Sequence, residues 1–147
     1  MKAEPTSIPD VKLIKADVFN DARGSFHETW SERRFAEAGI ETNFVQDNFS
    51  ESSQHTLRGL HYQIEQAQGK LVRVAYGKVF DVAVDIRKSS PYFGRWVGVE
   101  LSHDNKHALW IPPGFAHGFL VLSKSAIFEY KCSDYYAPEH ERTILWD

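Results

Sequence analysis

Apolar and polar side chains alternate with a period of two along most of the chain, which is typical of β-strands. Residues 70–76 show this alternation, with Lys70 on the same face as two valines. Residues 79–86 show it as well, and there Asp81 and Asp85 share a face with a valine and an alanine. Many short strands at this spacing predict an all-β fold, either a sandwich or a closed barrel.

Turn residues separate these strands, and we expect a hairpin at three of the turns. The expected hairpins join 70–76 to 79–86 around Gly77, 96–101 to 107–111 around Asn105, and 118–122 to 126–132 around Lys124. One segment has helical signals instead: Ser31 is the expected N-cap, 32–38 the helix and Gly39 its stop, with Phe35 as the apolar anchor.

Length and composition limit the possible functions. The 147 residues suit one domain, 1–147, and the formal net charge of −3 provides no basic field that would attract nucleic acid or an anionic membrane. Cys132 is the only cysteine, which excludes an intrachain disulfide and is typical of a reducing cytosol. No stretch approaches the roughly 20 apolar residues of a membrane span. We therefore expect a soluble, cytoplasmic protein.

Charged side chains gather in 57–63 and 68–73, where Arg58, His61 and Lys70 stand among glycines and apolar residues, together with an arginine at 73. Charges inside a barrel cost desolvation energy unless an anion compensates them, and a phosphate would do so. The alternative is structural: His61 as an ordinary core or surface histidine and Lys70 as a solvated charge.

The segment 111–119 contains Pro-x-Gly-x-x-His and resembles the second motif of the cupin superfamily, whose histidine, here His117, points into the barrel. Metal-binding cupins also carry His-x-His in their first motif, where this chain has His61 followed by Tyr62 and Gln63. A catalytic transition metal needs about three protein ligands. We expect no metal, and we interpret the other histidines as surface residues.

Eight motifs follow one another along almost the whole chain, at 19–28, 44–50, 57–63, 69–73, 81–87, 90–94, 110–119 and 130–136. In this order and spacing they resemble the dTDP-4-dehydrorhamnose 3,5-epimerases. The resemblance implies a cupin-type double-sheet antiparallel β-barrel, or jelly roll, with one or two short helices. It also implies an isomerase without a cofactor, which inverts C3, C5 or both in a nucleotide-linked 4-keto-6-deoxyhexose during rhamnose-type deoxysugar biosynthesis.

The resemblance implies a role for each matched residue. His61 is then the general base, Tyr130 the acid on the opposite face of the sugar ring, and Lys70 the cation that stabilises the enolate oxygen. The matched substrate-binding residues are Arg23, Phe26 and Glu28 for the nucleoside, Gln46, Asn48 and Arg58 for the pyrophosphate, Tyr136 beside the base, and His117 in the sugar pocket. Some family nucleotide contacts come from a neighbouring subunit, which implies a homodimer.

These residue types suit the chemistry. A C–H group next to a ketone loses its proton only if the carbonyl oxygen can take the negative charge, and a fixed cation such as Lys70 stabilises that charge. Inversion also needs a base and an acid on opposite faces of the carbon, and imidazole and phenol fill these roles.

The chain departs from the family pattern at its end. Family members usually continue past Asp147, and that extension carries the aspartate that orients the catalytic histidine. We consider Asp85 as its replacement, which would hold the tautomer of His61. Two alternative functions remain at this point: a sugar-nucleotide 3,4-ketoisomerase, and a binder of sugar nucleotides without turnover. The sequence does not specify the nucleobase, the sugar or the number of inverted carbons.

Overall fold

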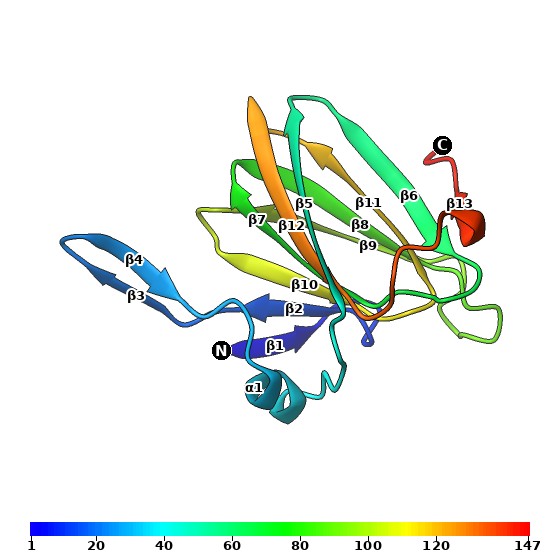
Figure 1. The fold of residues 1–147 in the computed structure, drawn as a ribbon, viewed down its shortest axis with the longest axis horizontal. Helices are drawn as coiled ribbons and strands as arrows, with labels where there is room; N and C mark the ends of the chain where they lie inside the picture. The colour runs from blue at the N-terminus through cyan, green and yellow to red at the C-terminus, as the bar shows by residue number, and fades with distance from the viewer.

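Two antiparallel β-sheets pack face to face in the computed structural model, which describes residues 1–147 (Figure 1). One sheet has the order β1 (Lys2–Pro5), β2 (Lys12–Lys15), β10 (His107–Ile111), β7 (Lys70–Tyr76), β12 (Ser125–Cys132) and β5 (Gln46–Ser53). The other has the order β13 (Glu141–Thr143), β6 (Leu57–Gln63), β11 (Phe115–Val121), β8 (Lys78–Asp85) and β9 (Trp96–Ser102). This arrangement confirms the expected all-β double-sheet fold.

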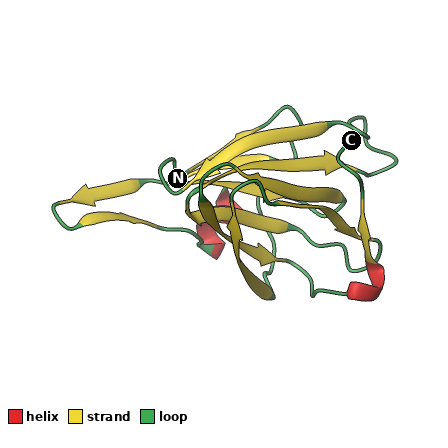
Figure 2. Ribbon diagram, turned by 90° about the horizontal axis from the view of Figure 1, so that it is seen from above, coloured by secondary structure: helices red, strands yellow, loops and turns green.

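Three further elements lie around the two sheets. A separate hairpin, the arm, consists of β3 (Val18–Asp21) and β4 (Gly24–His27) and extends away from the sheets, as Figure 2 shows from above. The helices are both short, α1 (Glu32–Glu37) and the 3-10 helix η1 (Pro138–His140). No helix in the chain is long and apolar enough to cross a membrane.

The three predicted hairpins are wrong. The segments β7 and β8 lie in different sheets, and the same is true of β9 and β10 and of β11 and β12. Alternation along a strand specifies which side chains face the core, but it does not specify which strand lies alongside. Each of these turns therefore carries the chain from one sheet to the other, so residues that are neighbours in sequence reach opposite walls of the barrel.

The face assignments within the strands are confirmed. The inward face of β8 consists of Val79, Asp81, Ala83 and Asp85, all of them buried. On β7, Val72 lies in the core between the sheets, whereas Leu71 on the opposite face packs in a second cluster.

The second apolar cluster lies on the outer face of the six-stranded sheet and includes the helix. Phe35 of α1 is buried there with Leu71 and Trp110, and such burial of an aromatic ring contributes about 1.5–3 kcal/mol. The Ser31 side chain accepts a hydrogen bond from the Arg34 amide at 3.4 Å. The predicted cap, helix and anchor are thus confirmed.

Candidate active site

A cavity of about 520 Å³ opens between the two sheets, and side chains from both walls line it. The five-stranded sheet contributes His61 from β6 and His117 from β11, while the six-stranded sheet contributes Lys70 from β7 and Tyr130 from β12. Asn48 from the edge strand β5 lies in the same lining. The cavity therefore collects most of the polar residues that the sequence motifs singled out.

The candidate base and acid come from different sheets. His61 belongs to β6, whereas Lys70 and Tyr130 lie on the neighbouring strands β7 and β12. The Lys70 ammonium nitrogen is 5.6 Å from the centroid of the Tyr130 ring. A molecule held in the cavity would have an imidazole on one wall and a phenol with an ammonium group on the other.

Burial adjusts the protonation of all three side chains. Desolvation lowers the pKa of His61, and the nearby Glu141 carboxylate only partly opposes this effect, so the imidazole is neutral near pH 7. Desolvation also raises the pKa of Tyr130, which keeps the phenol protonated. It lowers the pKa of Lys70, while the carboxylates of Asp81 and Glu141 act in the opposite direction.

His61 is oriented by residues near the end of the chain. Its Nδ1 lies 3.1 Å from Thr143 Oγ1 and 3.3 Å from Glu141 Oε1. The Tyr136 hydroxyl donates a hydrogen bond to Glu141 Oε2 at 2.7 Å. Strand β13 brings these groups to the cavity because it pairs with β6, with Thr143 opposite His61. Sequence reasoning missed Glu141 and Thr143, since three residues are too few for a clear strand pattern.

Asp85 does not have the role that the sequence suggested for it. Its carboxylate accepts hydrogen bonds from Arg87 Nη2 at 2.8 Å and from the Ser90 hydroxyl at 2.5 Å. The bonds from Arg87 are the main reason why the pKa of Asp85 falls to about 2. The carboxylate is thus fully engaged in holding the loop after β8, and the carboxylate beside His61 is Glu141.

The second histidine of the cavity, His117, is buried and has a carboxylate of its own. Its Nε2 lies 2.8 Å from Asp81 Oδ1, and its ring stacks on Phe128 with centroids 5.9 Å apart. Desolvation raises the pKa of Asp81, and the contact with His117 partly opposes this. Sequence alternation placed Asp81 on the inner face of β8 without indicating its partner.

Two glycines bring the histidine strands unusually close together. His61 and His117 are directly opposite each other in the pairing of β6 and β11, and the register shifts after His117. A Cβ atom at Gly118 would lie 2.5 Å from the Arg58 carbonyl oxygen, and one at Gly59 would lie 2.5 Å from the Cα of Gly118. Only glycine at both positions permits this approach.

Of the three residues matched to pyrophosphate binding, Asn48 and Arg58 line the cavity and Gln46 lies beside it. Arg58 Nε donates to Ser52 Oγ at 2.9 Å, which ties β6 to β5. Gln46 donates from Nε2 to Asn48 Oδ1 at 3.0 Å, and its Oε1 accepts a bond from the Tyr136 amide at 3.0 Å. Gln46 therefore positions two neighbours that line the cavity and is not part of the lining itself.

Comparison with known proteins identifies the chain. The sequence profile described as dTDP-4-dehydrorhamnose 3,5-epimerase matches residues 5–147. The Pseudomonas aeruginosa dTDP-4-dehydrorhamnose 3,5-epimerase is 60% identical over 148 aligned positions, which cover 100% of this chain and 82% of that protein. The chain belongs to the dTDP-4-dehydrorhamnose 3,5-epimerase family. It is accordingly an isomerase of the epimerase class.

Solved structures of family members have the same fold. The Legionella pneumophila dTDP-6-deoxy-D-glucose-3,5-epimerase in complex with dTDP-4-keto-L-rhamnose superposes with a TM-score of 0.96 at 55% identity, covering 99% of this chain and 78% of that one. The Bacillus anthracis dTDP-4-dehydrorhamnose 3,5-epimerase with TDP and PPi bound has the same TM-score at 42% identity, with 99% and 85% covered.

The arm of this epimerase lies apart from its own cavity. Phe26 is 72% exposed, and the Arg23 side chain contacts only Asp21 of the same hairpin. Glu28, just after the arm, has its carboxylate 3.8 Å from Arg34 Nε. The structure therefore does not bring the three residues matched to nucleoside binding together with His61 within one chain.

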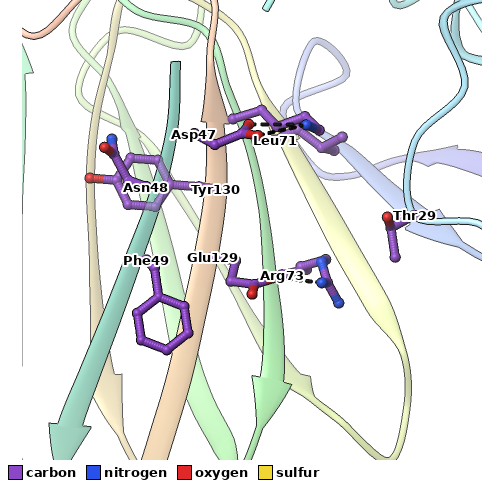
Figure 3. Close-up of a pocket in the computed structure, with 9 residues that line it drawn as sticks. Thr29, Asp47, Asn48, Phe49, Leu71, Arg73, Glu129 and Tyr130 are labelled. Atoms are coloured by element: carbon purple, nitrogen blue, oxygen red, sulfur yellow. Dashed lines mark hydrogen bonds and ion pairs between the residues drawn. The ribbon is translucent and has the colours of Figure 1, made fainter.

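A second hollow, of about 320 Å³, lies on the outer face of the six-stranded sheet of the epimerase (Figure 3). Arg73 pairs there with Glu129, and Lys131 Nζ lies 3.0 Å from Asp47 Oδ1. Arg73 is therefore outside the cavity that Lys70 lines, because residues an odd number of positions apart on a strand face opposite sides. No three His, Cys, Asp or Glu side chains lie close enough to hold a metal ion.

Proposed function

We propose that this chain inverts both C3 and C5 of a dTDP-linked 4-keto-6-deoxyhexose. One observation carries the proposal: the cavity has an imidazole on one wall and a phenol with an ammonium group on the other. The similarity to relatives named as 3,5-epimerases supports the choice of both carbons and of the thymidine nucleotide.

The catalytic step follows from the positions of the three side chains. The Nδ1 of His61 lies against Glu141 and Thr143, which favours a proton on Nδ1 and leaves Nε2 as the base. Nε2 takes the proton from the carbon next to the ketone, and the electron pair moves onto the carbonyl oxygen. Lys70 stabilises the resulting enolate, and Tyr130 donates a proton to the opposite face. His61 then releases the proton it has taken to solvent, and the Tyr130 phenolate takes one up, which returns both side chains to their starting forms.

We further propose that the site is completed in a homodimer. The arm carries two exposed rings, Phe19 at 66% and Phe26 at 72%, on a hairpin that pairs with no other strand of its chain. In a twofold dimer the arm of one protomer would reach the cavity of its partner and bring Arg23 and Phe26 to the nucleoside. Exposed aromatic rings of this kind suit either stacking on a base or an interface between subunits.

The proposal is tested by exchange of solvent deuterium into a dTDP-linked 4-keto-6-deoxy sugar, followed by NMR. His61→Asn is expected to lower the exchange rate by about 10²–10⁴, because the base is lost. Tyr130→Phe is expected to retain more exchange than net inversion, because proton removal does not need the phenol. The matched control is His103→Asn, since His103 lies at a surface hollow outside the cavity.

Three outcomes contradict this function. Unchanged exchange in His61→Asn would reject the base. A 3-keto product from the unaltered protein would indicate a ketoisomerase, and nucleotide binding without any exchange would indicate a protein that only binds sugar nucleotides.

A further inference from the structure

Asp81 is a buried carboxylate that the proposed reaction does not use. The residue is fully buried on the inner face of β8, and its Oδ2 has no hydrogen-bond partner. A carboxylate in such surroundings is unfavourable unless its charge serves a purpose or is compensated nearby. Its only hydrogen bond joins Oδ1 to Nε2 of His117.

Asp85, on the same strand, is a buried carboxylate with a structural role, and hydrogen bonds compensate its charge. It lies on the same face of β8 and is equally buried, but three side-chain hydrogen bonds from Arg87 and Ser90 hold both of its oxygens. Asp81 has no such guanidinium. The difference indicates that the Asp81 carboxylate acts on His117 and on the cavity and does not hold a loop.

The bond to Asp81 decides which nitrogen of His117 carries the proton. A carboxylate acceptor at Nε2 favours the Nε2–H tautomer and leaves Nδ1 as an acceptor. Nδ1 makes no hydrogen bond within the chain, and the His117 side chain lines the cavity. Stacking on Phe128, with 21° between the ring planes, holds the imidazole in place.

Lys70 supplies the positive charge that balances Asp81. Its ammonium group is buried in the same cavity, where desolvation lowers its pKa and the charge of Asp81 raises it. The charge of Lys70 in turn lowers the pKa of Asp81, although burial is the larger influence and raises it.

We infer that Asp81 is a positioning residue: it holds His117 in the Nε2–H form, so that the free Nδ1 accepts a hydrogen bond from a hydroxyl group of the sugar. This inference rests on the proposed function for the identity of the ligand, a hydroxylated sugar ring. The tautomer of His117 is a property of the unliganded protein, so this part of the inference is independent of the proposed function.

The tautomer is measured by long-range ¹⁵N–¹H NMR of the histidine side chains in the full chain, with His117→Gln to assign its signals. In the unaltered protein at neutral pH we expect a protonated Nε2 and an unprotonated Nδ1 on His117. In Asp81→Asn the amide group can donate to Nε2, so the Nδ1–H form should appear. Asp85→Asn is the matched control, and it should lower the melting temperature but keep the tautomer.

Kinetics distinguish a positioning role from a purely structural one. At metal sites, loss of a carboxylate that orients a histidine typically costs about 10–100-fold in affinity or activity, and we expect a loss of similar size in kcat/KM of Asp81→Asn, mainly through KM. A hydroxyl contact is present in the bound substrate as well as in the transition state, which is why KM should change most. In the His117→Gln background the Asp81→Asn change should add little further loss.

Several results would overturn the inference. A proton on Nδ1 of His117 in the unaltered protein would do so even if Asp81→Asn failed to fold. An unchanged tautomer of His117 in Asp81→Asn would also overturn the inference. A changed tautomer with an unchanged kcat/KM would overturn it as well. Absence of epimerisation by the unaltered protein would reject the proposed function and leave the tautomer result standing.

Discussion

The two histidines of the cavity face each other across β6 and β11 but lie in different environments. His61 is partly exposed and contacts Glu141, a residue that is itself accessible to solvent. His117 is buried and contacts Asp81, which is buried completely. The base can therefore exchange protons with solvent, whereas the imidazole deeper in the cavity has a fixed hydrogen-bonding pattern.

The pH dependence of activity should report on His61. Desolvation places its pKa below the ordinary value of about 6.5, and the proposed mechanism requires the neutral form. Activity should therefore persist as the pH falls to the ordinary histidine pKa of about 6.5 and decline only at lower pH. Glu141→Gln removes a negative charge that raises the pKa, so the acidic limb of kcat/KM should move to still lower pH.

Glu139→Gln is the control for this measurement, because Glu139 is near the same turn but contacts His140 instead of His61. A limb that moves to higher pH in Glu141→Gln, or that moves equally in both variants, would contradict this description of the base.

At the scale of elements, the pairing of β6 and β11 sets the distance between the histidines. Gly59 and Gly118 allow the two backbones to approach, and the register shift between His117 and Phe119 falls at the same point. A small displacement of these strands would move both imidazoles relative to a bound sugar. Misplacement by about 1 Å is enough to lower a rate by about 10²-fold.

Gly118→Ala should therefore reduce both stability and activity. The added Cβ would meet the Arg58 carbonyl oxygen at 2.5 Å, and forced strand separation typically costs about 1–3 kcal/mol. Thermal unfolding measures the stability, and kcat/KM measures the effect on the site. Gly94→Ala is the comparison: its Cβ would meet no atom within 4 Å, so only the left-handed backbone at φ +80° opposes it, and it should lower stability without lowering kcat/KM. Full activity in a Gly118→Ala protein of normal stability would show that the close approach is not required.

At the scale of the whole molecule, the arm and the cavity are separate parts of one chain. Figure 1 shows the arm extended beyond the edge of the sheets, and its aromatic side chains are left exposed. If the arm completes a partner's cavity, each site of the dimer draws residues from two chains. Activity would then depend on pairing between chains and not only on the fold of each.

Complementation between two inactive variants tests this arrangement. Phe26→Ser should weaken nucleotide binding, whereas His61→Asn inactivates the cavity that it belongs to. In a mixed dimer the intact arm of the second variant would reach the intact cavity of the first, and random mixing would restore about a quarter of the sites. Light scattering measures the oligomeric state, and kcat/KM measures the recovery. Phe93→Ser, with an exposed ring outside the arm, should remain active without mixing.

Failure of the mixture to regain activity, when each variant is shown to form dimers, would contradict an arm shared between subunits. A monomeric unaltered protein with full activity would contradict it as well.

The sequence alone determined properties that depend on near neighbours along the chain. The period of two assigned the inner faces of β7 and β8, including Asp81 and Asp85. The cap, length and anchor of α1 followed from local signals around Ser31 and Phe35. Family motifs indicated the chemistry proposed for His61, because the residue types of a motif and their spacing can be read from one sequence.

The tertiary structure decided what depends on contacts between distant residues. Strand partners were decided by the packing of two sheets, and for that reason all three expected hairpins became crossings from one sheet to the other. The same packing placed Glu141 beside His61, left Asp85 with Arg87, and paired Asp81 with His117. A carboxylate's partner depends on which strands meet, and that is a property of the closed barrel and not of any local pattern.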